Sequence, residues 1–213
     1  MKAIIFDLDG TLVDSLRDIT TALNRALRHL QQPHVDRHRV RSWIGDGLSM
    51  LCRRALPNTD EPAVLRLIEQ TAMHYRTHCV VHTQPFPNIL KMLDLLRERE
   101  VPLAVLSNKP HGLTVQVMRE LGLSPFFQEI CGCRNEQDKK PAPQVALRIS
   151  ETLETPPESI YVVGDSAVDI LTARHAGMRA VAVTWGFRTE QELMAGEPDR
   201  LVHDPLEILD LVD

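Results

Sequence analysis

The residues most capable of chemistry stand in the first fifteen positions, MKAIIFDLDGTLVDS. Asp7 and Asp9 lie two positions apart directly after the apolar run AIIF, which predicts a buried strand that ends in a turn at Gly10. Two carboxylates crowded at the end of a strand repel each other, so such a site calls for a cation, a shared proton, or both. An isolated Asp-Gly pair predicts only a turn, but the intact pattern Asp-x-Asp-Gly-Thr after an apolar run favours a chemical site.

Three later segments also place polar side chains just after an apolar run. These are Ser107, Asn108 and Lys109 after residues 102–106, Lys140 beyond residues 128–131, and Asp165 and Asp169 after residues 160–163. If the runs are neighbouring parallel strands, their carboxyl ends meet at one edge of the sheet. That edge would then hold three or four carboxylates, a hydroxyl group and a fixed positive charge.

This set of side chains fits phosphoryl transfer. Carboxylate oxygens are ligands that suit Mg²⁺, which keeps some of its waters and accepts substrate phosphate. A lysine and a hydroxyl group can neutralise and orient the phosphate oxygens as charge moves onto them. One carboxylate can act as the nucleophile and form an aspartyl-phosphate. A second one two residues on can protonate the leaving oxygen and later activate water.

The elements that must position these side chains form two units. Residues 16–81 predict an all-helical unit, with helices at 16–31, 36–43, 48–56 and 60–79. The segment 82–87 carries two prolines and predicts a linker. From residue 88 onward helices alternate with apolar strands, which predicts an α/β fold with a Rossmann-like parallel sheet and helices on both faces. The expected domains are therefore a core of residues 1–15 and 82–213 and a small helical cap of residues 16–81.

The composition narrows the class of protein. The chain has 213 residues, of which 43% are hydrophobic and 25% are charged, as is ordinary for a soluble globular protein. No apolar run approaches the ~20 residues needed to cross a bilayer, and Lys2 is followed by only a few apolar residues. Neither a membrane span nor a signal peptide is therefore expected. The four cysteines predict reduced, structural thiols, so we expect a cytoplasmic protein.

Charge is unevenly spread along the chain. The formal net charge is -5, yet residues 16–81 hold ten Arg and no Lys against six Asp and Glu. A basic segment in an acidic protein can attract a small anionic substrate. No run of Lys and Arg has aromatic residues between its members, and the chain holds only nine aromatic side chains. Nucleic acid is therefore not an expected partner.

Taken in order, the four polar segments resemble the motifs of the haloacid dehalogenase superfamily of aspartyl-nucleophile phosphohydrolases. The resemblance spans nearly the whole chain, and the helical unit at 16–81 matches the cap that this family inserts after its first motif. It implies that Asp7 is the nucleophile and Asp9 the general acid and base. It implies a phosphate-binding set of Thr11, Ser107, Asn108 and Lys140, and a Mg²⁺-binding set of Asp7, Asp9 through its backbone carbonyl, Asp165 and Asp169. Asp169 is either a water-mediated ligand or a partner that holds Lys140.

The cap segment narrows the resemblance further. The segments WIGDG at 43–47, RRAL at 53–56 and TWGF at 184–187 resemble those of bacterial phosphoglycolate phosphatases. This implies a specificity loop made of Gly45, Asp46 and Gly47, and a carboxylate-binding role for Arg54 or a neighbouring arginine. Many such phosphatases have Asn between the two glycines. Asp46 would disfavour an anionic substrate unless an arginine pairs with it.

The resemblance implies a Mg²⁺-dependent phosphatase for a small anionic phosphomonoester, with 2-phosphoglycolate as the first candidate. Asp9 argues against a dehalogenase, and the absence of lysine from residues 16–81 argues against a phosphonoacetaldehyde hydrolase, which needs a cap lysine. A β-phosphoglucomutase-type sugar phosphomutase, or a phosphatase for another small sugar phosphate, stays open because Asp9 would serve it equally well. A non-catalytic binding or regulatory protein is a further alternative, although every catalytic position is filled. Both a monomer and a homodimer are compatible with the sequence.

Overall fold

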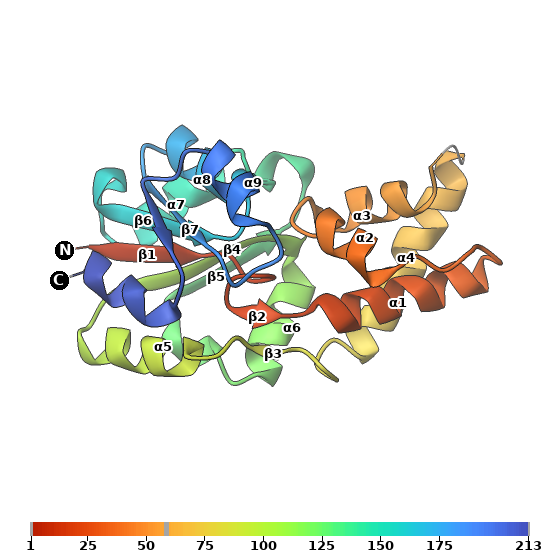
Figure 1. Ribbon diagram of the computed structural model, residues 1–213, viewed down its shortest axis with the longest axis horizontal. Coiled ribbons are helices and arrows are strands. Elements are labelled where there is room, and N and C mark those ends of the chain that lie inside the picture. Colours follow the sequence, from red (N-terminus) through yellow and green to blue (C-terminus); the bar gives the residue numbers. More distant parts are fainter. Residues whose placement is uncertain (1, 58–59, 213) are drawn as a thin grey trace.

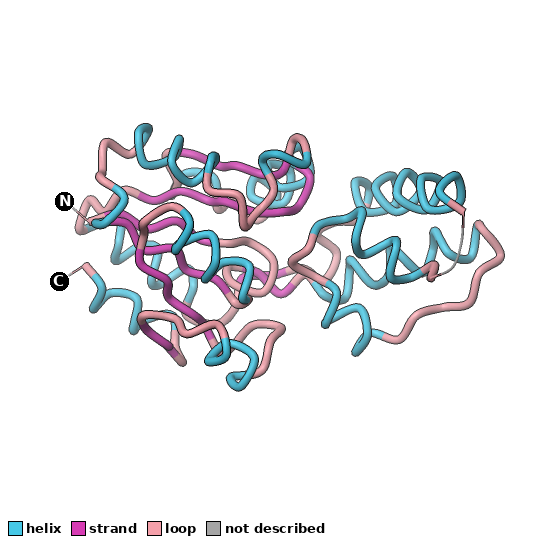
Figure 2. Tube along the Cα trace, turned by 90° about the horizontal axis from the view of Figure 1, so that it is seen from above, coloured by secondary structure: helices cyan, strands magenta, loops and turns pink. Residues whose placement is uncertain are grey.

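The computed structural model describes residues 2–57 and 60–212, which form a larger and a smaller lobe (Figure 1). The larger lobe is built around a sheet and carries both ends of the chain, whereas the smaller lobe is helical. Seen from above, the two lobes meet over a narrow region (Figure 2). None of the helices in the described ranges is both long and apolar enough to span a bilayer.

In the described residues the main sheet has six parallel strands in the order β5-β4-β1-β6-β7-β8. They are β1 Ala3–Phe6, β4 Leu103–Pro110, β5 Glu129–Cys133, β6 Ile160–Gly164, β7 Arg179–Val183 and β8 Arg200–Val202. The predicted α/β class and parallel sheet are confirmed. The sequence does not predict β8, because a run of three residues that begins with arginine is too short and too mixed in polarity to show a strand period.

The central strand β1 is buried on both faces, which explains its unbroken apolar sequence. Ile4 and Phe6 belong to the core layer that contains α5 Ile89–Glu98 and α6 His111–Glu120. Ala3 and Ile5 belong to the opposite layer, with α7 Gln144–Thr152, α8 Ala167–His175 and α9 Glu190–Ala195. Ile5 stands opposite Ala104 of β4 and Val162 of β6. This register brings the residues that follow β1, β4 and β6 to the same edge of the sheet.

The smaller lobe contains α1 Leu16–His29, α2 Arg37–Trp43, α3 Gly47–Ala55 and α4 Glu61–Thr77. These helices lie close to the predicted ranges, because their apolar residues recur at helical spacing and face one another. Leu23 and Leu27 of α1 share a buried core with Val64 and Leu67 of α4. The Asp60 side chain caps α4 by accepting a hydrogen bond from the Ala63 N–H at 3.3 Å.

The chain passes between the lobes twice, and the two connecting segments form a short ribbon. One of them is the segment 82–87, where the two prolines predict a linker. β2 Val13–Asp14 pairs antiparallel with β3 Gln84–Pro85. Beside this ribbon, the buried carboxylate of Asp18 accepts hydrogen bonds from three successive backbone N–H groups, at residues 81–83, and from the Thr83 hydroxyl. Burial alone would raise the pKa of Asp18, but these hydrogen bonds outweigh it and lower the pKa. The two connecting segments are therefore fastened to each other.

Candidate active site

Side chains from the ends of β1 and β6, from α8 and from the loop before α7 meet at one edge of the sheet. Lys140 Nζ lies 2.9 Å from Asp7 Oδ1 and 2.6 Å from Asp169 Oδ1, and all three residues are buried. The carboxylates of Asp7, Asp165 and Asp169 each offer an oxygen within 4.8 Å of the others. The structure therefore brings together one lysine and three carboxylates from the set that the sequence singles out.

The three carboxylates carry more negative charge than Lys140 can balance. Burial and the neighbouring Asp169 raise the pKa of Asp7 to about 6, although Lys140 acts in the opposite direction. Burial and the charges of Asp7 and Asp169 raise the pKa of Asp165 to about 7. A divalent cation among these oxygens would remove the repulsion, and carboxylate oxygen is a donor that hard cations prefer. The residues present therefore fit a divalent metal ion.

The segment after β7 holds Asp165 in place. Asp165 Oδ2 accepts a hydrogen bond of 2.6 Å from the Phe187 N–H. A Cβ at Gly186 would collide with the Asp165 side chain, so the close approach of this backbone requires glycine. The Trp185 indole N–H donates to the Thr11 carbonyl at 2.9 Å. The TWGF segment thus supports both the carboxylate cluster and the loop after β1.

Asp9 is held by a second lysine, from β4. Both carboxylate oxygens of Asp9 lie 2.7 Å from Lys109 Nζ, and the Ser15 hydroxyl donates to Asp9 Oδ1 at 2.6 Å. Burial alone would lower the pKa of Lys109, but the Asp9 carboxylate raises it, so the ammonium group stays charged. The sequence places Lys109 in the polar segment after residues 102–106 but indicates no role for it. Its only signal is its place directly after Ser107 and Asn108.

Asn108 joins three parts of the site through its amide. Its Oδ1 accepts from the Lys140 N–H at 2.7 Å, and its Nδ2 donates to the Lys140 carbonyl at 3.2 Å and to the Gly45 carbonyl at 2.9 Å. The side chain that the family resemblance places at the phosphate therefore holds Lys140 and contacts the smaller lobe. Ser107 is buried and lies at the lobe boundary with it. The buried Thr11 hydroxyl has no hydrogen-bond partner among the described residues.

Two arginines fasten the lobes together. Arg41 of α2 donates to the carbonyls of Gly186 and Phe187, at 2.9 Å each. In the opposite direction, Arg188 donates to the carbonyls of Arg41 at 3.0 Å and Ile44 at 2.6 Å. The smaller lobe is therefore docked on the same TWGF segment that positions the carboxylate cluster.

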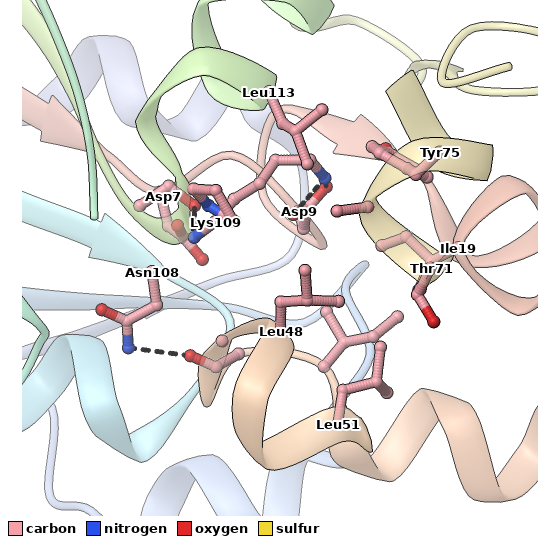
Figure 3. A pocket seen from close by; sticks show the side chains of 16 residues that line it. Asp7, Asp9, Ile19, Leu48, Leu51, Thr71, Tyr75, Asn108, Lys109 and Leu113 are labelled. Atoms are coloured by element: carbon pink, nitrogen blue, oxygen red, sulfur yellow. Dashed lines mark hydrogen bonds and ion pairs between the residues drawn. The ribbon is translucent and has the colours of Figure 1, made fainter. Parts of the chain in front are cut away.

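A cavity of about 60 Å³ lies between the lobes, beside Asp7 and Asp9 (Figure 3). Most of its wall is apolar and comes from both lobes: Ile19, Ile44, Leu48, Leu51, Ala72, Pro110 and Leu113. Figure 3 shows the Asp9–Lys109 pair across from Tyr75 of α4, while Leu48 and Leu51 lie on another side. The cavity is thus an apolar space with a polar end next to the carboxylates of Asp7 and Asp9.

The loop between α2 and α3 lies at this cavity. Gly45 and Gly47 both line it and have φ values of 110° and 80°, which favour glycine. Asp46 and Arg54 instead line a neighbouring open groove, where they form an ion pair of 2.5 Å. An arginine therefore balances the charge of Asp46, as an anionic substrate requires. The structure does not bring Arg54 to the cavity where the sequence would have it bind a carboxylate.

Known proteins resemble this chain in sequence and in fold. The model of the haloacid dehalogenase-like hydrolase family matches residues 4–183. A phosphoglycolate phosphatase of Chromobacterium violaceum is 36% identical, with 100% of this chain and 96% of its own covered, and one of Aquifex aeolicus is 33% identical, with 100% and 97% covered. The crystal structure of a predicted phosphoglycolate phosphatase from Haemophilus somnus has a TM-score of 0.93 at 29% identity, with 100% of this chain and 98% of that one covered. The chain therefore belongs to the haloacid dehalogenase-like hydrolase family and is an enzyme of its phosphatase group.

Proposed function

We propose that this enzyme is a Mg²⁺-dependent phosphatase that converts 2-phosphoglycolate to glycolate and phosphate through an aspartyl-phosphate on Asp7. The observation that carries the proposal is the surroundings of Asp7, whose carboxylate contacts Lys140 and lies beside two further carboxylates. A carboxylate in this position can attack an electrophile whose own negative charge is neutralised by a cation and a lysine. The phosphorus of a phosphomonoester is such an electrophile.

The proposed reaction has two displacement steps at phosphorus. An Asp7 oxygen attacks phosphorus and the bond to the ester oxygen breaks, while Asp9 gives a proton to that leaving oxygen. Asp9 then takes a proton from water, whose oxygen attacks the aspartyl-phosphate, and Asp7 is released as a carboxylate together with inorganic phosphate. Lys140, Ser107 and the unpartnered Thr11 hydroxyl would bind the phosphoryl oxygens during both steps.

The carboxylates of Asp7 and Asp165 and the backbone carbonyl of Asp9 would hold Mg²⁺. When bound, the ion would supply positive charge that neutralises both the carboxylates and the phosphate oxygens. Asp169 accepts hydrogen bonds of 2.6 Å from both Lys140 and Ser166. These contacts support a role for Asp169 as the partner that holds Lys140.

The substrate is proposed from the relatives and from the cavity. The relatives from C. violaceum and A. aeolicus are both phosphoglycolate phosphatases by name and align over the full chain. A sugar phosphate would bury several hydroxyl groups, each of which needs a hydrogen-bond partner. The mostly apolar wall and a volume of about 60 Å³ suit a two-carbon acid better. This observation favours 2-phosphoglycolate over the substrate of a sugar phosphomutase.

A panel of phosphomonoesters tests this proposal. We expect kcat/KM for phosphate release from 2-phosphoglycolate to exceed that for glucose 6-phosphate and ribose 5-phosphate by at least about 10-fold, because the mostly apolar wall of the cavity offers few partners to the sugar hydroxyls. A chelator should abolish the activity and added Mg²⁺ should restore it. A phosphomutase would instead interconvert glucose 1-phosphate and glucose 6-phosphate without net phosphate release. If no phosphomonoester of the panel is turned over, the result would contradict the proposal and favour a non-catalytic binding protein.

Mg²⁺ is expected to raise Tm more at about pH 8 than at about pH 5.5. The pKa values of Asp7 and Asp165, about 6 and about 7, lie above the value of about 3.9 in an unfolded chain. The folded protein binds these protons more tightly than the unfolded chain does, so the metal-free protein loses stability as pH rises through about 4 to 7. Mg²⁺ competes with the same protons, so its stabilising effect grows over that range.

Differential scanning fluorimetry with and without Mg²⁺ measures this effect at both pH values. The Asp165→Asn variant is the control, because it loses one proposed ligand and one of the titrating groups. Its Tm should respond to Mg²⁺ only weakly at either pH. An equal Mg²⁺ response of the wild-type protein at both pH values would contradict the proposed coupling, as would a full response of the variant.

A further inference from the structure

The polar end of the cavity has a single cation. Among the described residues that line the cavity, Lys109 is the only one with a cationic side chain. Three cap arginines bind partners elsewhere: Arg41 on core carbonyls, Arg53 on Glu61 and Arg54 on Asp46. Of the described lining residues, Lys109 alone could therefore neutralise a second anionic group of a substrate.

Tyr75 completes this polar end from the smaller lobe (Figure 3). Its side chain is only 4% exposed, and its ring centroid lies 4.5 Å from Lys109 Nζ. Its hydroxyl oxygen faces Lys109, which can only donate to it, so the hydroxyl proton itself has no acceptor among the described residues. A buried hydroxyl without a partner is destabilising unless a ligand supplies one. Tyr75 therefore offers an unused donor beside a fixed positive charge.

We propose that Lys109 and Tyr75 form the subsite for the carboxylate of the substrate, Lys109 through an ion pair and Tyr75 through its hydroxyl. The inference rests on the proposed function and deepens it, because it names the groups that recognise the glycolate half of 2-phosphoglycolate. A single CH₂ group separates the ester oxygen of that molecule from its carboxylate. Asp9 must reach the ester oxygen, and Lys109 Nζ lies 2.7 Å from both Asp9 oxygens. The substrate carboxylate is thereby brought next to Lys109.

Lys109 can bind both carboxylates at once. Its ammonium group has three N–H donors; two of them go to Asp9, and the third faces Tyr75, where the substrate carboxylate would accept it. The Asp9 carboxylate and the Tyr75 ring together fix the ammonium group, so the substrate meets a cation that is already in position. Lys109 comes from β4 of the core and Tyr75 from α4 of the cap. The subsite is therefore complete only when the two lobes are docked.

The test compares 2-phosphoglycolate with 2-phosphoglycolamide, which has nearly the same shape but a neutral amide in place of the carboxylate. The measured quantity is the ratio of kcat/KM for the acid to kcat/KM for the amide. Lys109→Met should lower this ratio about 10- to 100-fold, the effect expected for a hydrogen bond between charged groups. Lys109→Met also removes the partner of Asp9. That change alters the turnover of the acid and of the amide alike, so it cancels in the ratio. Tyr75→Phe should lower the ratio about 2- to 10-fold with little change in Tm, because the hydroxyl proton has no acceptor in the ligand-free protein and Lys109 keeps its ion pair with Asp9.

Matched controls are Lys91→Met on the exposed face of α5 and Tyr161→Phe on β6, and both should keep the wild-type ratio. A wild-type ratio in Tyr75→Phe and in Lys109→Met would overturn the subsite and leave the proposed function standing. If Lys109→Met does not fold, the ratio measured for Tyr75→Phe alone decides whether the subsite exists. A wild-type enzyme that hydrolyses other phosphomonoesters but does not prefer the acid over the amide would overturn the proposed substrate and the subsite together.

Discussion

Replacing Asp7 by asparagine is expected to lower kcat for phosphate release by about 10⁴- to 10⁶-fold, because the amide is not a nucleophile toward phosphorus. The loss should be the same for every phosphomonoester, since each one passes through attack by the same oxygen. Steady-state release of inorganic phosphate from 2-phosphoglycolate measures it.

The Asp7→Asn variant should also stay folded. The pKa of Asp7 is raised to about 6, so near pH 8 its carboxylate is destabilising in the metal-free site, and asparagine removes that charge. Lys140 keeps its contact of 2.6 Å with Asp169. We therefore expect the metal-free variant to have a Tm at about pH 8 equal to or above that of the wild-type protein. Asp94→Asn, which breaks only a surface ion pair with Arg97, is the matched control. Wild-type turnover by Asp7→Asn would mean that another group is the nucleophile.

Replacing Asp9 by asparagine is expected to separate the two steps of the reaction. With 2-phosphoglycolate, kcat should fall by about 10²- to 10⁴-fold, because the leaving alkoxide is no longer protonated. Acetyl phosphate is of similar size, and its leaving acetate needs no proton. The first step should therefore stay fast with acetyl phosphate, whereas attack of water on the aspartyl-phosphate still lacks its base. A rapid-quench experiment should show a burst of about one acetate per active site and then slow turnover.

The burst also shows that the slow turnover of Asp9→Asn is not caused by unfolding. Unfolding is a concern because the substitution leaves the buried ammonium group of Lys109 without its anionic partner Asp9. Breaking a buried pair of this kind costs about 3–5 kcal/mol, so the Tm of the variant should fall. An unfolded protein cannot give a stoichiometric burst. Equal losses with both substrates and no burst would contradict the role of Asp9 in the second step.

The cluster of buried carboxylates is predictable from the sequence for a topological reason. Asp7 and Asp165 each follow an apolar run that is buried on both faces, and parallel pairing of β1 with β6 leaves their carboxyl ends adjacent. Asp169 is one helical turn beyond Asp165, on the face that meets Lys140. Local pattern and sheet order together therefore determine this cluster.

The contacts of Lys109 and Arg54 are not predictable in the same way. The pairing of β4 with β5 shifts register between Ser107 and Pro110, and the direction of the Lys109 side chain depends on that irregularity. Arg54 pairs with Asp46 in the neighbouring groove, and the sequence alone does not show which acidic group an arginine side chain will contact.

The contacts between the lobes are hidden for a different reason. Arg41 and Arg188 bind backbone carbonyls that lie more than a hundred residues away along the chain, and a carbonyl group carries no signature in the sequence. The contacts of Asp18 beside the ribbon of β2 and β3 are equally hard to predict, because Asp18 binds backbone N–H groups, which every residue except proline carries. Such contacts follow only from the packing of the two lobes.

In the proposed mechanism, Asp7 carries the phosphoryl group between the two steps. Acid quench of Asp9→Asn during turnover of acetyl phosphate, followed by mass spectrometry of the peptide that contains Asp7, tests it most directly. We expect about one phosphoryl group per active site on Asp7, and none when Asp7→Asn is added to the same variant. A phosphoryl group on Ser107, or release of phosphate with no phosphorylated peptide at any time, would contradict the claim.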